Sequence, residues 1–121
     1  MAIRATQLGA AGAVLNGYSR DTRGILRLNF PTFSVGRYAQ DQRPRGQVAA
    51  FRTTIQIGHT TIAPGDLVFG DLDGVAVVPR QIEREVVRQA QEKVSREHLV
   101  RSAFEREEMS AMEAVDKFGA M

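Results

Sequence analysis

Short apolar runs predict strands in the part of the chain that precedes Pro79. The run "AGAVL" at 11–15 is continuously apolar and too short for a helix, so we expect a strand that is buried on both faces. Residues 30–36, "FPTFSVG", predict another strand, which Pro31 interrupts at its start. The segment "QVAAFRTTIQIG" at 47–58 alternates in polarity, which predicts a strand with two different faces.

Glycine, proline and aspartate mark the turns and short helices between these strands. Residues 3–12, "IRATQLGAAG", have a helical apolar spacing that ends in glycines, and 20–29, "RDTRGILRLN", predict a short helix. The polar stretch 37–46, "RYAQDQRPRG", predicts a loop. Further turns are predicted at Gly58-His59, at Pro64-Gly65 and between two strands within 66–79.

The polarity pattern changes to a helical period after Pro79 and predicts a long amphipathic helix from Gln81 to about Phe104. Its apolar face is formed by Ile82, Val86, Val87, Ala90 and Val94. Glutamates that stand four residues before arginines predict ion pairs between Glu92 and Arg96 and between Glu97 and Arg101.

A capping box, Ser110 and Glu113 in "SAME", predicts a second helix that begins at Ser110 and ends near Gly119. Helices and strands together predict an α/β fold, and the length of 121 residues predicts one domain, 1–121.

Composition removes several classes of protein and site. The chain has no cysteine, which excludes disulfides, thiolate zinc sites and cysteine nucleophiles. No apolar run approaches the roughly 20 residues of a membrane span, and the first residues lack the layout of a signal peptide. We therefore expect a soluble cytoplasmic protein with no membrane partner.

The charge is unevenly distributed along the chain. Residues 1–60 carry eight Arg and two Asp, a net charge of +6, whereas residues 61–121 carry eight basic and twelve acidic groups, a net charge of −4. The arginines are scattered among turns and aromatic residues make up only 7% of the chain. A nucleic-acid interface needs a basic stripe with aromatics, so no nucleic-acid partner is expected.

Three pairs of acidic or basic residues are candidates for chemistry. Arg20 and Asp21 stand side by side after a predicted strand, in "NGYSRDTRGI"; without further context such a pair is most often a solvated turn. Asp71 and Asp73 have the spacing of metal ligands, but an Asp-Leu-Asp-Gly turn uses the same residues to bind its own backbone, and we favour that structural role. The two histidines, His59 and His98, are too far apart to argue for zinc and are expected to be exposed.

Four segments resemble the RraA-like family in the same order as they occur in its members: "GAAGAVLNGYSRD", "FPTFSVGRYAQD", "IAPGDLVFGDLDGVAVVP" and "AMEAVDKFG". The family contains 4-hydroxy-4-methyl-2-oxoglutarate aldolases, oxaloacetate decarboxylases and an inhibitor of ribonuclease E. The resemblance extends from Ala5 onward. It implies a three-layer β/β/α swivelling domain.

The resemblance also implies roles for individual residues. In the aldolases the aspartate that corresponds to Asp21 holds a divalent cation, and the arginine that corresponds to Arg20 contacts the pyruvyl part of a small 2-oxo acid substrate. Mg²⁺ or Mn²⁺ is expected, because these ions accept a carboxylate, several waters and substrate oxygens as ligands. An acidic residue from a neighbouring subunit approaches the metal waters in the family, and Glu97 in "EHLVR" is the best match; a surface pair with Arg101 is the alternative.

The resemblance implies further that in the family a Gly-rich loop, G-x-L-G-E/D, precedes the helix that is predicted here within residues 3–12. This loop binds the substrate carboxylate. We therefore expect this chain to be the C-terminal portion of such a protein, with little activity alone, and to form a trimer or hexamer or to bind a partner chain that carries the missing segment. Two functions stay open: a metal-dependent, pyruvate-forming aldolase or oxaloacetate decarboxylase, and a non-enzymatic interaction protein like the ribonuclease inhibitor.

Overall fold

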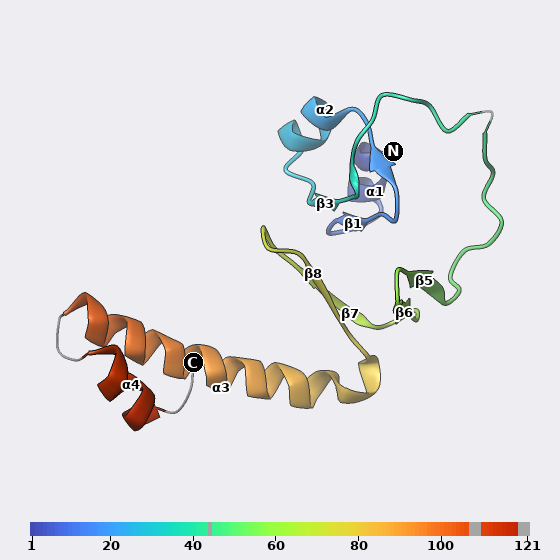
Figure 1. Ribbon diagram of the computed structural model, residues 1–121. Coiled ribbons are helices and arrows are strands. Elements are labelled where there is room, and N and C mark those ends of the chain that lie inside the picture. Colours follow the sequence, from blue (N-terminus) through green and yellow to red (C-terminus); the bar gives the residue numbers. More distant parts are fainter. Residues whose placement is uncertain (44, 107–109, 119–121) are drawn as a thin grey trace. The chain divides into compact units, whose positions relative to one another are not determined.

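The computed structural model describes residues 1–43, 45–106 and 110–118. The chain divides into two compact units, Met1–Pro79 and Arg80–Met121 (Figure 1). Helices and strands both contribute to the first unit, and helices form the second, so the α/β class expected from the polarity pattern is confirmed. That residues 1–121 act as one domain stays a prediction.

The first unit begins with strands that pair in parallel around a short helix. Its elements are α1 (Ala2–Gln7), β1 (Ala13–Val14), β2 (Tyr18–Ser19), α2 (Thr22–Arg27), β3 (Thr32–Phe33) and β4 (Gly36–Arg37). β1 pairs with β3, and β2 pairs with β4 with Ser19 opposite Arg37. Because parallel strands need a crossover connection, α2 lies between the two halves of each pair in the chain. The segment from β2 through α2 to β4 is thus a small β-α-β unit, and Arg20 and Asp21 occupy its first connection.

Two antiparallel hairpins complete the first unit. β5 (Ile55–Ile57) pairs with β6 (Thr60–Ile62), and β7 (Leu67–Gly70) pairs with β8 (Val75–Val78). The turn at Gly58-His59 is confirmed, with Gly58 at φ +59°, a conformation that glycine adopts at little cost. The turn at Pro64-Gly65 is confirmed by a hydrogen bond of 3.1 Å from the Asp66 N–H to the Ala63 carbonyl.

The side chain of Asp71 stabilises the turn between β7 and β8. One carboxylate oxygen of Asp71 accepts hydrogen bonds from the backbone N–H groups of Asp73, at 2.9 Å, and Gly74, at 3.3 Å. An aspartate that binds the backbone two residues ahead forms a local turn of its own. The structural role favoured for Asp71 over metal binding is therefore confirmed.

The long strand predicted over 47–58 is wrong for its first part, since only Ile55–Ile57 are in a strand. Arg52 has φ +55°, and the side chains of Val48 and Phe51 are exposed to 83% and 79%. Alternating polarity indicates which residues would share a face of a strand, but a strand also needs a neighbouring strand for its backbone hydrogen bonds. Within the described part of the chain, residues 47–54 pair with no strand.

The expectation that 11–15 is buried on both faces is also too strong, because β1 is half-buried and Leu15 is 40% exposed.

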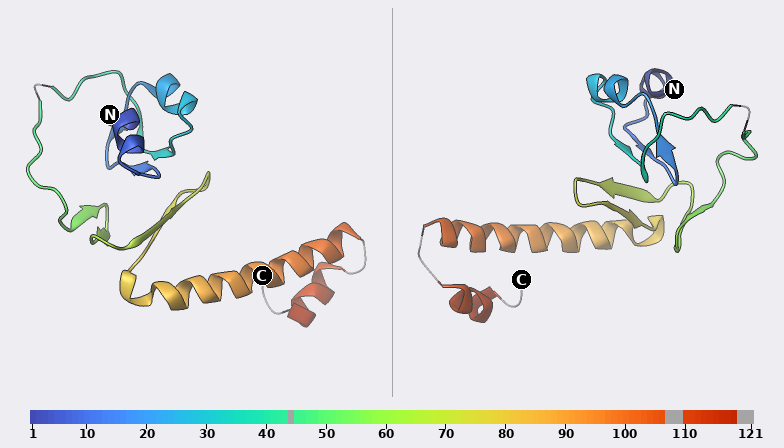
Figure 2. Two further views of the ribbon diagram at one scale, coloured as in Figure 1. Left: turned by 180° about the vertical axis from the view of Figure 1, so that it is seen from behind. Right: turned by 45° about the horizontal axis from the view of Figure 1, so that its top comes forward.

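The second unit consists of a 3₁₀ turn, Arg80–Ile82, the long helix α3 (Glu83–Glu105) and α4 (Ala111–Phe118). Figures 1 and 2 show α4, in red, beside the C-terminal half of α3, in orange. Val100, Ala103 and Ala114 are buried in this unit. None of the helices in residues 1–43, 45–106 and 110–118 is long and apolar enough to cross a membrane.

Hydrogen bonds at the start of α4 confirm the predicted capping box. The carboxylate of Glu113 accepts from the N–H of Ser110 at 2.7 Å and from its hydroxyl at 2.8 Å, and the N–H of Glu113 donates to the same hydroxyl at 3.3 Å. The predicted end of this helix at Gly119 lies outside the described residues.

The ion pairs on α3 differ from the expected ones. Glu92 pairs with Arg88 at 2.6 Å, and Glu85 pairs with the same guanidinium at 2.6 Å, so the predicted pair with Arg96 is wrong. Arg88 binds one carboxylate a turn before it on the helix and another a turn after it. Glu92 therefore pairs with Arg88, which precedes it, and not with Arg96, which follows it.

Candidate functional site

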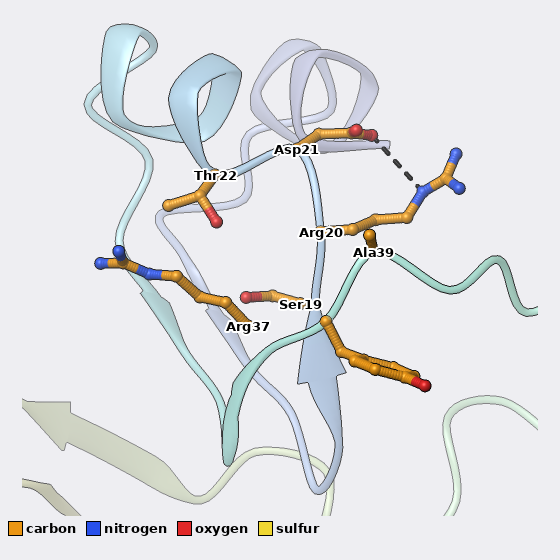
Figure 3. A pocket seen from close by; sticks show the side chains of 7 residues that line it. Ser19, Arg20, Asp21, Thr22, Arg37 and Ala39 are labelled. Carbon is orange, nitrogen blue, oxygen red and sulfur yellow. Dashed lines mark ion pairs between the residues drawn. The ribbon is translucent and has the colours of Figure 1, made fainter.

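A shallow pocket of about 290 Å³ lies where β2 ends and α2 begins (Figure 3). Its lining residues come from the C-terminal ends of β2 and β4 and from the residues that follow each strand. They are Ser19, Arg20, Asp21, Thr22, Arg37, Tyr38 and Ala39. The carboxyl ends of parallel strands are where α/β proteins bind ligands. The structure therefore brings the predicted site residues Arg20 and Asp21 together at one pocket, along with five residues that sequence reasoning did not name.

The backbone of Asp21 starts α2, and its side chain is left for other contacts. Its carbonyl accepts the first hydrogen bonds of the helix, from the N–H groups of Gly24 at 2.9 Å and Ile25 at 3.2 Å. Asp21 has φ 59° and ψ 31°, a left-handed conformation that aspartate and asparagine tolerate better than most residues. The carboxylate makes no capping hydrogen bond, and its side chain is 79% exposed. A carboxylate held in this way can bind a ligand from solution.

The guanidinium of Arg20 lies between two carboxylates. Its Nε is 3.6 Å from Oδ2 of Asp21, and its Nη1 is 3.3 Å from Oδ2 of Asp41 (Figure 3 shows the pair with Asp21). All three side chains are about half or more exposed, and ion pairs of this kind contribute little to stability. Arg20 can therefore exchange a protein carboxylate for a carboxylate or oxo group of a ligand at small cost.

The side chains of Ser19 and Thr22 bring hydroxyl groups to the lining of the pocket. The hydroxyls of Ser19 and Ser34 share a hydrogen bond of 3.1 Å, and Ser34 also donates to the Gly36 carbonyl at 3.1 Å. These bonds tie β2 to the start of β4. Figure 3 shows Ser19 and Thr22 with Arg37 on one side of them and the pair of Arg20 and Asp21 on the other.

The donor groups suit Mg²⁺ or Mn²⁺ better than a metal that is held by protein alone. No group of three or more His, Asp or Glu side chains that could hold a metal exists in the part of the chain that the structure describes. Mg²⁺ is commonly bound by one or two carboxylates, with water and substrate oxygens as the other ligands. Asp21 supplies one exposed carboxylate of this kind, so the residues present fit the expected cation.

Glu97 lies on α3, in the second unit, whereas all lining residues of the pocket belong to the first. Its carboxylate pairs with Lys93 at 3.6 Å, so the alternative pair with Arg101 is wrong. The lysine stands one turn before Glu97 on the same helix and takes the place expected for Arg101. His59 lies in the turn between β5 and β6 and His98 on α3; both are exposed, as expected.

Sequence reasoning missed Arg37, Asp41 and the hydroxyls of Ser19 and Thr22. A signal for Arg37 was present, because "YSR" and "GRY" follow two runs that were each predicted as strands. Their parallel pairing in the register Ser19 to Arg37 then puts the two ends at one edge. No comparable local signal marked Asp41, which reaches Arg20 from the loop after β4.

Comparison with known proteins agrees with the motifs. The family description "RraA-like: Aldolase/RraA" matches residues 1–77. A protein of Halalkalibacterium halodurans named "Putative 4-hydroxy-4-methyl-2-oxoglutarate aldolase" is 39% identical over 89 residues, which are 74% of this chain and 42% of that protein.

Solved structures resemble the fold as well. The structure of an uncharacterized protein from Pseudomonas syringae pv. tomato str. DC3000 matches with a TM-score of 0.88 and 33% identity, over 93% of this chain and 56% of that one. A chain described as one of the novel cellulases from microbes associated with the gut ecosystem matches with a TM-score of 0.76 and 36% identity, over 81% of this chain and 44% of that one. The chain thus spans about half the length of these relatives. With its α/β fold and its motifs, it belongs to the RraA-like family.

Proposed function

We propose that this chain takes part in the metal-dependent cleavage of small 2-oxo acids to pyruvate, as an aldolase acting on 4-hydroxy-4-methyl-2-oxoglutarate or as an oxaloacetate decarboxylase. The observation that carries the proposal is the pair of Arg20 and Asp21 at the edge of a pocket, in a member of the RraA-like family. The name of the Halalkalibacterium relative, which is 39% identical, supports the aldolase reaction.

Both reactions break the same bond of the substrate. The C3–C4 bond breaks and its electron pair stays on C3, where it is delocalised onto the C2 oxygen as the enolate of pyruvate. In the aldol cleavage the C4 hydroxyl loses its proton and C4 leaves as the carbonyl of a second pyruvate. In the decarboxylation C4 leaves as CO₂. A proton added to C3 then completes the first pyruvate, so one site that stabilises an enolate serves both reactions.

The residues of the pocket have different roles in the proposed reaction. Arg20 donates hydrogen bonds to the pyruvyl end of the substrate and stabilises the negative charge that develops on the C2 oxygen. Asp21 holds the divalent cation, which when bound supplies further charge stabilisation at the same oxygen. The hydroxyl of Thr22, which lines the pocket, provides a neutral donor.

We propose further that the active protein is a trimer or hexamer, or a complex with a partner chain that carries the Gly-rich loop of the family. In such an assembly Glu97 of a neighbouring copy would be the acid at the metal waters. Large apolar side chains that are exposed in the first unit, such as Tyr18 at 64% and Phe51 at 79%, support association.

The test is release of pyruvate from oxaloacetate and from 4-hydroxy-4-methyl-2-oxoglutarate, with Mg²⁺ or Mn²⁺ and with EDTA. The chain is assayed alone and together with the preceding segment of the Halalkalibacterium relative. We expect little activity from the chain alone, because misplaced substrate loses the advantage of positioning, and metal-dependent activity from the combination.

Arg20→Ala should lower the turnover by at least about 100-fold, the usual cost of removing one donor to a developing oxyanion. Arg23→Ala is the matched control, because Arg23 is an exposed arginine of α2 that does not line the pocket. If the combination releases no pyruvate from either substrate, the enzyme proposal fails. The interaction protein, the second function expected from the family, then takes its place, and the exposed apolar side chains favour it.

A further inference from the structure

The backbone that leads to the candidate site contains a bulge. Between the last pair of β1 with β3 and the first pair of β2 with β4, one side has three residues, 15–17, and the other side has two, 34–35. One extra residue on one of two paired strands is a β-bulge, which interrupts the ladder and leaves backbone groups without their usual partners. The bulge contains the dipeptide Asn16-Gly17.

The backbone is held on both sides of this dipeptide, but not at the peptide bond that joins its two residues. The N–H of Leu15 donates to the Phe33 carbonyl at 2.8 Å, and the carbonyl of Gly17 accepts from the Val35 N–H at 2.9 Å. The N–H of Gly17 has no hydrogen-bond partner in the part of the chain that the structure describes. The side chain of Asn16 is exposed and likewise has no hydrogen-bond partner among the described residues.

An asparagine amide next to a backbone nitrogen of this kind can undergo deamidation. The nitrogen of Gly17 loses its proton and attacks Cγ of Asn16, ammonia leaves, and a succinimide ring is formed. Water then adds to one of the two ring carbonyls and opens the ring to aspartate or isoaspartate. Glycine has no Cβ to hinder the attack. We infer that Asn16 deamidates spontaneously in the folded protein, with water as the reagent.

The chain has one other asparagine, Asn29, and its surroundings differ at the decisive atom. Asn29 is exposed as well, but it precedes Phe30, whose side chain is only 7% exposed. The N–H of Phe30 donates to the Ile25 carbonyl at 3.3 Å. This nitrogen is bonded and belongs to a residue that is packed in the core, so attack on the Asn29 amide requires local unfolding. The fold therefore makes Asn16 the reactive asparagine of the two.

Deamidation changes the strand that carries the candidate site. Asn16 stands four residues before Arg20 and five before Asp21. Both products add one negative charge, and isoaspartate also adds one atom to the main chain within the bulge. The inference does not depend on the proposed function, because the reaction needs neither a substrate nor a metal.

Mass spectrometry of tryptic peptides tests the inference, since cleavage after arginine puts the two asparagines in separate peptides, 5–20 and 28–37. The full chain is incubated near neutral pH in water enriched in a heavy oxygen isotope and is then digested in ordinary water. Only deamidation of the intact chain then incorporates the heavy oxygen. We expect peptide 5–20 to gain the label at least about tenfold faster than peptide 28–37, because glycine leaves the nitrogen accessible. Electron-transfer fragmentation should find isoaspartate at position 16.

Gly17→Ala should slow the labelling of peptide 5–20 by about tenfold or more, because the added methyl group hinders ring closure. Gly17 does not have a positive φ, and a Cβ at this position would meet nothing within 4 Å beyond the chain neighbours, so we expect the variant to fold. Gly24→Ala is the matched control, since it adds the same methyl group in α2 and should leave both rates unchanged. Circular dichroism checks the fold of each variant.

The rate for the chain in urea shows how far the fold restrains Asn16. We expect the folded chain to react within about tenfold of the unfolded chain, because no described hydrogen bond has to open at Gly17. A much slower folded chain would mean that the bulge protects Asn16 as a regular ladder would, and it would overturn the inference. Three further results overturn it: no label in peptide 5–20, equal rates in the two peptides, or a rate that Gly17→Ala does not change.

Discussion

Gly70 of β7 lies directly against the aromatic ring of Phe33 in β3. A Cβ atom added to Gly70 would be 2.6 Å from Cζ and 2.7 Å from Cε2 of that ring. The hairpin of β7 and β8 therefore packs on the parallel strands through a position that has no side chain. Since Phe33 belongs to β3, which pairs with β1, this contact supports the β-α-β unit that carries the pocket.

Gly70→Ala should destabilise the first unit by about 1–3 kcal/mol, because the methyl group forces the ring of Phe33 or the strand to move. The midpoint of urea denaturation measures the effect. Gly24→Ala is the matched control: Gly24 is inside α2, and apart from its chain neighbours and the backbone of its own helix no described atom lies within 4 Å of a Cβ placed there. Alanine should stabilise that helix by up to about 1 kcal/mol. Equal effects of the two substitutions would contradict the close contact.

Local chemistry determined what the sequence could predict. The capping box of Ser110 and Glu113, the turn at Gly58 and the turn closed by Asp71 each depend on residues within four positions of one another, and all three are confirmed. The pair of Arg20 and Asp21 is likewise adjacent in the chain, but the strand predicted at 11–15 corresponds to β1, whereas the strand directly before the pair is β2.

Features that depend on distant segments were missed. The register of β2 with β4, which brings Arg37 opposite Ser19, is set by packing and by the connection through α2 rather than by either strand alone. The pairing of Arg20 with Asp41 joins residues about twenty positions apart across an irregular loop. Residues 47–54 failed as a strand for the same reason, because polarity alternation carries no information about a partner.

Binding of Mg²⁺ or Mn²⁺ at Asp21 should raise the melting temperature of the chain, since a ligand that binds the folded state stabilises it by mass action. At a metal concentration ten times the dissociation constant the gain is about 1.4 kcal/mol. Asp21→Asn should abolish the shift. Asparagine also tolerates the left-handed backbone at this position, so the variant removes the charge without straining α2.

Asp73→Asn serves as the control for this metal response, because Asp73 belongs to the same unit and lies in the turn for which a structural role was favoured. It should leave the metal-dependent shift intact. If the shift persists in Asp21→Asn, the cation is bound elsewhere.

The helix α4 should lose order as the solution is acidified. Hydrogen bonds from the backbone N–H of Ser110 and from its hydroxyl hold the pKa of Glu113 below its ordinary value. A carboxylate whose pKa is lower in the folded state stabilises that state above the unfolded pKa, and this contribution is lost as the pH falls through the folded pKa. We expect the amide shifts of α4 to move toward random-coil values between about pH 5 and pH 3.

The readout for this prediction must be specific to α4, because the ion pair with Arg88 also lowers the pKa of Glu85 on α3. NMR of individual residues separates the two helices. Glu113→Gln keeps a side chain that can close the capping box but removes the titration, so its helix should be insensitive to pH over this range. A pH response of α4 that is the same in the variant would show that another group is responsible.

The segment 47–54 should become a strand when the protein associates. Its polarity alternates, it leads directly into β5, and within the described residues it has no strand beside it, while Val48 and Phe51 are exposed to 83% and 79%. An unpaired strand edge with exposed apolar side chains is a common site for pairing with another chain. We expect sedimentation velocity to show species larger than the monomer, and the amides of 47–54 to be protected from hydrogen exchange in them.

Phe51→Glu should shift the sedimentation distribution toward the monomer and abolish that protection, because a charge placed in the contact must be desolvated. Met112→Glu is the matched control, since Met112 is also 74% exposed but belongs to α4, away in sequence from this segment. It should leave the distribution unchanged. A wild-type chain that sediments as a stable monomer would count against association altogether. An assembly whose size and exchange pattern are insensitive to Phe51→Glu would instead place the contact outside residues 47–54.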